Sequence, residues 1–528
     1  MRPFGDSAVV VGTDSVDEAH GLAAALGDVD PPGIDDVIVG FRSVTVVADP
    51  TATDVAALGQ ALASMPPAPA GRSTAKLVEI PVALDGSDLD DVAGLAHLSP
   101  SRVVELLTST DLTVAFVGFA PGFAYLVGLP PELASVPRRP TPRPAVPGGT
   151  VALAGGFAGI YPQTSPGGWQ LVGRTGMRLF DPHTPPFSVL RAGDVVRLRL
   201  DEVPAVSSAP TARRQPLWSD AARTLVVQDG GWLSFVQDRG RMAVAGLGVP
   251  RAGAADPYAM RIANKLVGND ENAAGIEATV QGPTLRFSSP AHVAVVGTSE
   301  VAIDGRGVLS DTVLPVGAGQ TMTVGIGRDG LRTYIAIGGG IDIATVLGSR
   351  SSDVLCGLGA GPLSGGDVLG LGTAGRPRGR RRPAGTSGEA AIRIIVGPDE
   401  FPVTTVERLL STTWEADPTS NRIGVRLRGG APLEVPVTGI ASRGMVTGAI
   451  QLPPDGRPIV LLCDHATVGG YPVIATVVSA DLGILGQVRP GDPVHFEPVD
   501  LVEARRARAA REEDVRHATV GWYPVRTD

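Results

Sequence analysis

Lysine is almost absent from this chain of 528 residues. Lys76 and Lys265 are its two lysines, and the other 43 basic residues are arginines. A Walker A phosphate loop needs a lysine after a glycine-rich run, and neither lysine follows such a run. Both lie in apolar, periodic stretches, which favours a structural side chain over a Schiff-base or biotinylated lysine. The sequence therefore predicts neither a P-loop nor a biotinyl lysine.

Cysteine is equally scarce. Cys356 and Cys463 cannot form a disulfide framework or a CxxC pair, so a reducing, cytoplasmic compartment is expected. Cys463 ends a strand-like run that begins at Ile459, which predicts a buried and inert thiol. The seven histidines show no HxH or HExxH spacing, so no metal site is predicted.

Excess positive charge and unbroken hydrophobic runs are also missing. The net charge of −9 argues against a nucleic-acid-binding protein, and the arginine-rich run at 376–382 lies in a Gly/Pro/Ser stretch typical of a solvated linker. The uncharged run 112–131 is interrupted by Pro-Gly and Pro-Pro, which predicts a buried strand and a loop instead of a membrane span. Asp6 precedes any apolar segment, so no signal peptide is expected.

Aromatic residues make up only 4% of the chain, whereas there are 69 glycines and 46 prolines. The cores are therefore expected to consist of Val, Leu, Ile and Ala, in short strands joined by many turns. The N-terminus differs: Ser7–Val11 and Ser43–Ala48 predict strands, and Ser15–Leu26 and Asp54–Met65 predict helices. These four segments predict a small α/β domain.

Two polar segments rich in Pro, Ser and Arg predict the domain boundaries. The expected order is a small α/β domain (1–75), a barrel (76–203), a linker (204–222), a β-barrel unit (223–372), a basic Gly/Pro linker (373–389), a second such unit (390–500), and a C-terminal helix and tail (501–528).

The three β-rich regions end alike. Gly193-Asp194, Gly366-Asp367 and Gly491-Asp492 each lead into an alternating strand. Loops of the form Gly-Gly-aromatic, at 167–169 and 469–471, precede the first and third of these endings at similar distances. The pattern predicts repeated β-barrels.

Residues 1–200 contain an ordered series of motifs, namely GFAPGFAYL (118–126), PRR (137–139), VPGG (146–149), IYP (160–162), SPGGWQ (165–170) and GRT (173–175). This region resembles allophanate hydrolase subunit 1, a KipI-like family that includes the B-type component of 5-oxoprolinase. The second half contains VQDRGR (236–241), ANKLVGN (263–269), Glu277, GGGI (338–341), LGSRS (347–351), NRIG (421–424), GAIQLP (448–453), Asp464, Thr467 and GGYP (469–472). It resembles allophanate hydrolase subunit 2, a KipA-like family that includes the C-type component of 5-oxoprolinase.

The resemblance implies a fusion of the two components, built mainly of β-structure as tandem cyclophilin-like barrels with a small α/β domain at the N-terminus. It implies an ATP-dependent 5-oxoprolinase that opens the lactam of 5-oxoproline, a small cyclic amide, to glutamate. A third subunit of the LamB/YcsF-like type would complete the enzyme, with ATP bound by this chain or by that partner. Two alternatives stay open: a carboxyltransferase component of a biotin-dependent urea or amide carboxylase, and a non-enzymatic KipI/KipA-like regulator that binds a sensor histidine kinase.

Such a site must hold the substrate carboxylate, which an arginine fork does well, and polarise an amide oxygen, which backbone N–H groups of a Gly-Gly loop can do. The predicted catalytic residues are Asp464, Arg174 and Arg422. The predicted substrate-binding residues are Arg143, Gly167, Gly168, Trp169, Gln451, Thr467, Gly469, Gly470 and Tyr471.

Several of these side chains have a structural alternative. Packing is the favoured interpretation for Trp169 and Tyr471, and a turn cap is favoured for Asp238 over a general base. Arg139 and Arg241 are equally interpreted as partners in structural ion pairs.

The chain departs from the family pattern at three positions. Leu107 stands where a histidine is frequent, Ala466 where a glutamine is usual, and Asn421 where an aspartate is usual. The changes imply either altered substrate choice or a non-catalytic relative, with His465, one residue from Ala466, as a partial replacement for the glutamine.

Overall fold

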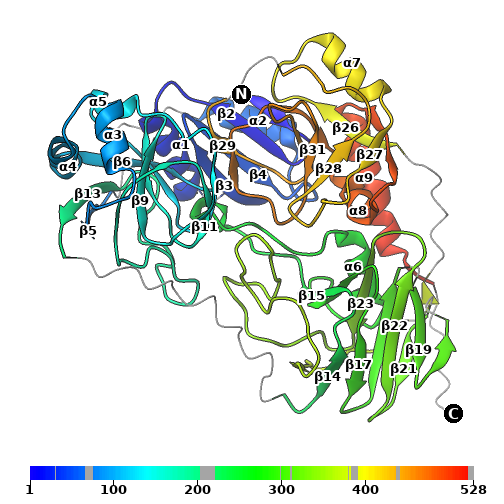
Figure 1. Cartoon of the computed structure of the whole chain (residues 1–528). Helices are drawn as coiled ribbons and strands as arrows, with labels where there is room; N and C mark the ends of the chain where they lie inside the picture. The colour runs from blue at the N-terminus through cyan, green and yellow to red at the C-terminus, as the bar shows by residue number, and fades with distance from the viewer. Residues whose placement is uncertain are drawn as a thin grey trace.

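The computed structural model describes residues 1–29, 31–65, 75–202, 221–297, 299–309, 312–378, 380–381, 391–435 and 440–520. Strands predominate over helices in these ranges, and the strands form barrel-like sheets, which confirms the mainly β class (Figure 1). Most of the predicted linkers 204–222 and 373–389 lies outside the described residues, as does the tail 521–528.

The N-terminal domain (residues 1–65) is a sheet in the order β1-β2-β4-β3 with two helices. Its elements are β1 (Arg2–Phe4), β2 (Ala8–Gly12), α1 (Val16–Val29), β3 (Ile34–Gly40), β4 (Ser43–Ala48) and α2 (Val55–Ser64). The predicted strands and helices are confirmed, with Asp54 capping α2 through the Ala56 N–H. Strand β3 was missed because a bulge between Ile34 and Asp36 interrupts its alternation.

The first barrel (residues 75–202) has the sheet order β12-β9-β10-β7-β6-β13-β5 and a two-stranded ribbon, β11-β8. Its elements are β5 (Leu77–Val82), α3 (Leu89–Leu95), α4 (Pro100–Ser109), β6 (Asp111–Val117), β7 (Ala124–Val127), α5 (Pro131–Ala134), β8 (Arg143–Val146), β9 (Thr150–Ala154), β10 (Phe157–Ile160), β11 (Ser165–Gly167), β12 (Gln170–Arg174) and β13 (Val195–Leu200). The run 112–131 forms β6, a loop and β7, as predicted, and its strands are largely buried.

The second barrel (residues 221–378) consists of two facing sheets around a Val, Ile and Leu core. Its elements are β14 (Thr224–Asp229), β15 (Leu233–Gln237), the 3-10 helix η1 (Ala245–Leu247), α6 (Pro257–Leu266), β16 (Gly275–Thr279), β17 (Thr284–Phe287), β18 (Ala291–Val296), β19 (Ser299–Ile303), β20 (Arg306–Val308), β21 (Leu314–Val316), β22 (Thr321–Gly327), β23 (Arg332–Ile337) and β24 (Val368–Gly370).

The third barrel (residues 391–500) has the sheet order β34-β27-β28-β31-β30-β33-β26-β35. Its elements are β26 (Ile392–Val396), α7 (Val403–Ser411), β27 (Trp414–Ala416), β28 (Gly424–Arg428), β29 (Arg443–Gly444), β30 (Ala449–Gln451), β31 (Ile459–Leu461), β32 (Val468–Gly469), β33 (Val473–Val477), η2 (Ser479–Asp481), α8 (Leu482–Gln487), β34 (Pro493–Val494) and β35 (Phe496–Pro498). The C-terminal helix α9 (Leu501–Arg516) confirms the prediction of a helix, and β36 (Thr519–Val520) pairs with β25 (Arg380–Arg381).

The three Gly-Asp endings form the same turn. The aspartates Asp194, Asp367 and Asp492 each accept a hydrogen bond from the backbone N–H three residues earlier, at 2.9, 2.7 and 2.8 Å. The glycine before each has a φ of 90° to 93°. The strand that follows each turn then pairs antiparallel, β13 with β6, β24 with β14, and β34 with β27. The repeat seen in the sequence is therefore a repeat of one barrel-closing turn.

Gly366→Ala should lower the free energy of unfolding by about 1–3 kcal/mol, because a Cβ forces strain at its φ of 93° although space is open around it. The matched control is Gly307→Ala in β20, where a Cβ also meets open space and φ is not positive. Chemical denaturation should show a loss for the first variant and almost none for the second. Equal losses would contradict this explanation of the turn.

The N-terminal domain lies between the first and third barrels (Figure 1). Phe4 and Val10 pack on Met445 and Val473 of the third barrel. On the other side, Ile38 belongs to a cluster with residues of the first barrel, η1 and β32. No helix within the described ranges is long and apolar enough to cross a membrane. The small α/β domain is thus the common neighbour of the larger units.

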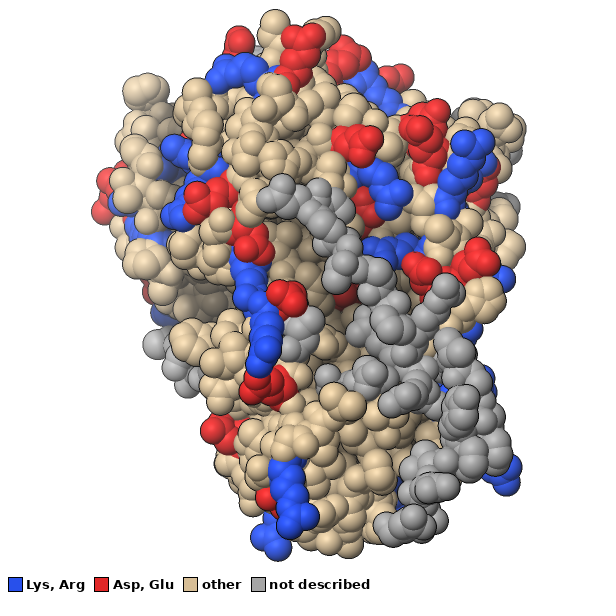
Figure 2. All heavy atoms as spheres, turned by 90° about the vertical axis from the view of Figure 1, so that its right-hand side faces the viewer, with Lys and Arg blue, Asp and Glu red and all other residues tan. Residues whose placement is uncertain are grey.

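The surface carries acidic and basic side chains that are intermixed. Figure 2 shows Lys and Arg interspersed with Asp and Glu over the face that it presents, with tan surface between them. Exposed acidic and basic side chains of the described residues also form ion pairs, such as Arg328 with Glu300 and Arg428 with Glu415. The described residues of this face therefore form no continuous basic surface of the kind that binds nucleic acid.

Candidate active site at the junction of the units

The predicted arginines of the first barrel are already paired with aspartates. Arg143 donates to both oxygens of the buried Asp88 carboxylate, at 2.7 and 2.9 Å, and the Leu171 N–H donates to the same group at 2.7 Å. Arg139 adds a longer bond of 3.4 Å, as its structural interpretation predicted. Arg174 pairs with Asp85 at 2.8 Å. A substrate carboxylate would have to displace these aspartates.

The two predicted aromatic side chains have different environments. Trp169 is buried at 6% exposure, and the rings of Phe123 and Tyr125 are edge-on to it, so the packing interpretation is confirmed. Gly167 beside it leaves space for Tyr161, whose hydroxyl oxygen a Cβ there would meet at 2.2 Å. Tyr471 is 45% exposed, so the expectation that it is packed is wrong.

The two Gly-Gly loops have equivalent settings. Gly167 lies opposite Arg143 in the β11-β8 ribbon, and Gly469 lies opposite Arg443 in the β32-β29 ribbon. Arg443 pairs with Asp399, which also accepts the Val473 N–H, so it repeats the arrangement around Asp88. Arg443 is not among the predicted site residues, although the loop opposite it is. Both loops are thus fixed by an arginine and an aspartate.

Arg422 and Asp464 form a buried ion pair. The Arg422 Nε and Nη2 donate to the two Asp464 oxygens at 3.0 and 2.9 Å, and Nη1 donates to Glu277 of β16. Nη2 also donates to the Gly253 carbonyl at 2.6 Å and to the Cys463 sulfur at 3.0 Å. Glu277 accepts the Ala255 N–H in turn. The pair therefore ties the third barrel to the second.

The charges in this network shift the pKa values of its members. Burial raises the pKa of Glu277, but the nearby Arg422 and Arg332 outweigh that effect and the pKa is lowered overall. Burial raises the pKa of the Cys463 thiol well above its usual value, so the predicted inert thiol is supported. Burial also lowers the pKa of His465, whose Nδ1 lies 2.8 Å from the Ala466 carbonyl.

The remaining predicted residues are distributed as follows. Gln451 donates to the Met445 sulfur at 3.2 Å, and Thr467 is buried.

Two of the positions that depart from the family pattern have structural roles. Leu107 is a buried core residue of α4, and the Asn421 side chain accepts the Ile423 N–H in a turn. Asp238 accepts the Gly240 N–H at 2.8 Å, which confirms its turn-cap interpretation. Arg241 is fully buried near Asp353, with 3.7 Å between their charged groups.

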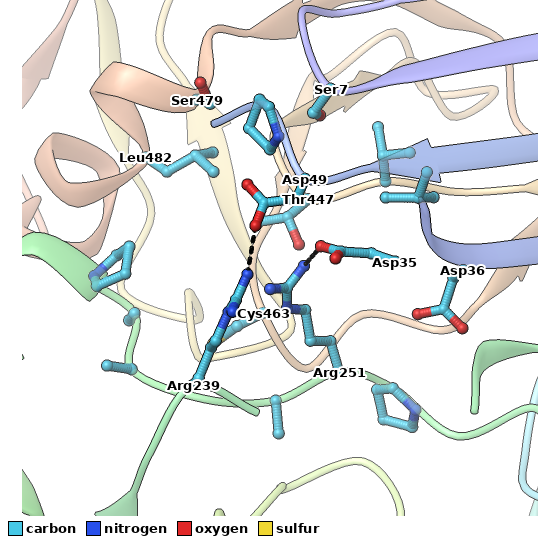
Figure 3. Close-up of a pocket in the computed structure, with 18 of the residues that line it drawn as sticks. Ser7, Asp35, Asp36, Asp49, Arg239, Arg251, Thr447, Cys463, Ser479 and Leu482 are labelled. Carbon is cyan, nitrogen blue, oxygen red and sulfur yellow. Dashed lines mark hydrogen bonds and ion pairs between the residues drawn. The ribbon is translucent and has the colours of Figure 1, made fainter. Parts of the chain in front are cut away.

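A pocket of about 430 Å³ lies where the N-terminal domain meets the second and third barrels (Figure 3). This volume is in the range of small-molecule sites. Its wall includes Ser7, Asp35, Asp36 and Asp49 of the N-terminal domain, Asp238, Arg239, Arg251, Tyr258 and Arg261 of the second barrel, and Thr447, Cys463, His465, Thr467, Ser479 and Leu482 of the third barrel. Of the predicted site residues, Thr467 reaches this pocket and the others do not.

Two ion pairs cross the pocket. Arg239 reaches Asp49 at 2.7 Å, and Arg251 reaches Asp35 at 2.8 Å (Figure 3). Sequence reasoning did not select these four residues, although Arg239 lies within the VQDRGR motif. Their partners are some 200 positions away, so no local pattern pointed to the pairs.

Asp36 is the carboxyl group in the pocket with the most altered acidity. Burial raises its pKa to about 6, against the lowering effects of the Ala245 N–H and of Arg251. The N–H of Ala245 donates to Asp36 at 2.9 Å and fixes the carboxyl group. A pocket carboxyl group that titrates near neutrality is a candidate for proton transfer. Within the described ranges, no group of three or more His, Cys, Asp and Glu side chains could hold a metal ion.

Comparison with known proteins matches two family descriptions to the two halves. Residues 1–190 match "carboxyltransferase domain, subdomain C and D", and residues 247–498 match "carboxyltransferase domain, subdomain A and B". The structure is similar to the crystal structure of the protein TTHA0988, with a TM-score of 0.85 and 34% identity, over 93% of this chain and 99% of that one.

Three relatives divide the chain in the same way. The B-type component of Bacillus subtilis 5-oxoprolinase is 36% identical over 38% of this chain and 93% of its own length. The C-type component of Escherichia coli 5-oxoprolinase is 36% identical over 53% of this chain and 92% of its own length. Urea amidolyase of Saccharomyces cerevisiae is 31% identical over 54% of this chain but only 17% of its own length. The chain therefore belongs to the carboxyltransferase-domain family that includes the B-type and C-type components of 5-oxoprolinase, and it joins a B-type region to a C-type region.

Proposed function

We propose that this chain is the fused B-type and C-type component of an ATP-dependent 5-oxoprolinase. It opens 5-oxoproline to glutamate together with a separate third subunit of the LamB/YcsF-like type, in the cytoplasm. Relatives of both halves are named as parts of that enzyme, which supports the proposal.

The observation that carries the proposal is the composition of the pocket. Ser7, Asp35, Asp36 and Asp49 come from the B-type region, whereas the rest of the wall comes largely from the C-type region. Neither region encloses this space without the other. A pocket shared by both regions explains why substrate binding and proton transfer would need them in one assembly.

Ring opening needs a group that accepts a proton from the attacking water and donors that polarise the amide oxygen. Asp36 is placed for the first task, with a pKa of about 6 and an anchored carboxyl group. Thr447 and Thr467 lie in the same wall and have hydroxyl groups for the second. Asp464 and Arg422, expected from the sequence to be catalytic, then act as positioning residues beneath Cys463 and His465.

Within this proposal ATP is bound by the partner subunit, and the charge of the pocket supports this choice. Six carboxyl groups, Asp35, Asp36, Asp49, Asp238, Glu271 and Glu512, line it against three arginines, Arg239, Arg251 and Arg261. The arginines are all paired with carboxylates. A triphosphate would meet net negative charge here, whereas a small monoanion needs only one arginine.

The test is an assay of this chain with a candidate third subunit. Glutamate and ADP should appear from 5-oxoproline and ATP, and neither protein alone should show turnover. The control is the same mixture without 5-oxoproline, in which release of ADP should stay at background. A folded complex without 5-oxoproline-dependent release of glutamate would reject the proposal.

A second candidate is the carboxyltransferase component of a urea or amide carboxylase, which the match to urea amidolyase favours. This reaction requires a separate biotin carrier, since no biotinyl lysine is predicted here. Co-purification with a biotinylated protein, and biotin-dependent carboxylation of urea, would support this candidate against the first.

A further inference from the structure

Arg239 and Arg251 extend from one loop of the second barrel, between β15 and α6, toward two acidic residues of the N-terminal domain. Figure 3 shows them side by side in the pocket, Arg239 directed at Asp49 and Arg251 directed at Asp35. Each makes one hydrogen bond to its aspartate, although a guanidinium group has five N–H donors. The two pairs have similar geometry, but the two aspartate carboxylates differ in how many other hydrogen-bond donors they have.

The Arg251–Asp35 pair is a fixed contact. The Asp35 side chain is only 8% exposed, and Arg251 is the one donor to its carboxylate among the described residues. Removal of the arginine would leave a buried carboxylate unpaired, which is costly. The backbone carbonyl of Asp35 also accepts the Ala243 N–H, so the loop is held here twice.

The Arg239–Asp49 pair can be exchanged at much lower cost. The Asp49 Oδ1 is held separately by the N–H and the hydroxyl group of Thr51, at 2.8 and 2.6 Å, and only Oδ2 takes Arg239. Burial raises the pKa of Asp49, but these Thr51 bonds and Arg239 outweigh it and lower the pKa overall. If Arg239 leaves, Asp49 keeps two donors. The Arg239 side chain is 44% exposed, so it has room to turn.

We infer that Arg239 releases Asp49 and binds the carboxylate of the ligand in its place, while Arg251 stays paired with Asp35. The ligand class is a small monocarboxylate that also carries an amide. The exchange breaks no covalent bond and replaces one carboxylate by another on the same guanidinium group. The inference rests on the proposed function, because that function supplies the carboxylate-bearing amide.

Asp49 is then an internal competitor of the ligand. Removing the competitor should strengthen binding, whereas removing Arg239 should weaken it. These opposite signs distinguish carboxylate exchange from a purely structural ion pair, because in a structural pair both substitutions would weaken ligand binding or leave it unchanged.

The experiment is calorimetric titration of the full chain with 5-oxoproline and, separately, with its uncharged carboxamide. Asp49→Asn, whose amide oxygen retains the Thr51 bonds, should lower the Kd for 5-oxoproline roughly twofold to fivefold, the fold-change expected from an exposed ion pair. Arg239→Gln should raise that Kd at least about tenfold, as loss of a charge-assisted bond does. Neither change should alter the Kd of the carboxamide. Asp111→Asn, at the exposed Arg197–Asp111 pair of the first barrel, is the matched control and should bind like the parent.

Several outcomes would overturn the inference: unchanged or weaker binding in Asp49→Asn, an equal response of the carboxamide, or no binding of 5-oxoproline by either the parent or Asp49→Asn. Thermal unfolding of each variant shows that it is folded. Binding with the expected signs but without turnover beside the third subunit would reject the proposed function and leave the carboxylate site standing. Turnover that Arg239→Gln leaves unchanged would reject the carboxylate site and leave the proposed function standing.

Discussion

Arg422→Ala should lower the free energy of unfolding by about 3–5 kcal/mol, the usual result of removing one partner from a buried ion pair. The substitution leaves the carboxylates of Glu277 and Asp464 without their shared guanidinium group, and both are fully buried. It also leaves the Gly253 carbonyl without this donor. Chemical denaturation followed by far-ultraviolet circular dichroism measures the change.

The matched control is Arg197→Ala, which breaks an exposed pair with Asp111 and should cost less than about 1 kcal/mol. A double variant, Arg422→Met with Asp464→Asn, should recover part of the loss because Asp464 is then uncharged and Glu277 keeps its pair with Arg332. A loss for Arg422→Ala no larger than that of the control would show that the pair does not hold the barrels together.

The pH dependence of this loss has a definite sign. The pKa of Glu277 is lowered in the folded chain, so its contribution is present above the unfolded value of 4.5 and disappears as the pH falls through the folded value. The difference in stability between the parent and Arg422→Ala should therefore shrink below about pH 4.5. A difference that grew on acidification would contradict the assignment.

Asp36→Asn should stabilise the chain at neutral pH and reduce its turnover. Burial raises the folded pKa of Asp36 from 3.8 to about 6. The folded state therefore loses stability as the pH rises from 3.8 through 6, by about 3 kcal/mol at most. The amide is never ionised and retains the bond from the Ala245 N–H. Loss of the proton acceptor should lower kcat by about 100-fold or more.

Two measurements check this prediction. The variant should unfold at a higher temperature than the parent at pH 7.5 but at nearly the same temperature at pH 3.5, where the Asp36 carboxyl group of the folded parent is protonated and as uncharged as the amide. In the parent, kcat/KM should rise with pH through about 6, and this rise should vanish in Asp36→Asn. Glu407→Gln, at an exposed position of α7, is the control for a simple change of charge. Lower stability of Asp36→Asn at pH 7.5 would refute the argument.

The local features of the fold were predictable because short-range rules determine them. The Gly-Asp turns need a positive φ at glycine and a carboxylate that accepts an N–H three residues back, and both requirements are visible in adjacent letters. Helix α2 could be placed because Asp54 caps it. Strand β3 was not predicted because its bulge places two acidic residues where strand alternation would place one.

The candidate site was predictable only in part. Arg422 and Asp464 were predicted to be catalytic, but their pairing with each other and with Glu277 could not be foreseen. Arg143 and Arg174 were selected as arginines that could hold a substrate carboxylate, yet their guanidinium groups already pair with Asp88 and Asp85. A sequence shows that an arginine is present but not whether a carboxylate pairs with it in the folded chain.

By itself the sequence determined the mainly β class, the repeated barrel-closing turn and the motifs of both halves, because these depend on neighbouring residues. Only the tertiary structure decided where a ligand can bind. Asp35, Asp36 and Asp49 lie about 200 positions before Arg239 and Arg251, and the pocket exists because the small N-terminal domain lies against both later barrels. Its charge balance, the raised pKa of Asp36 and the choice of exchangeable arginine all follow from that packing, which no local pattern encodes.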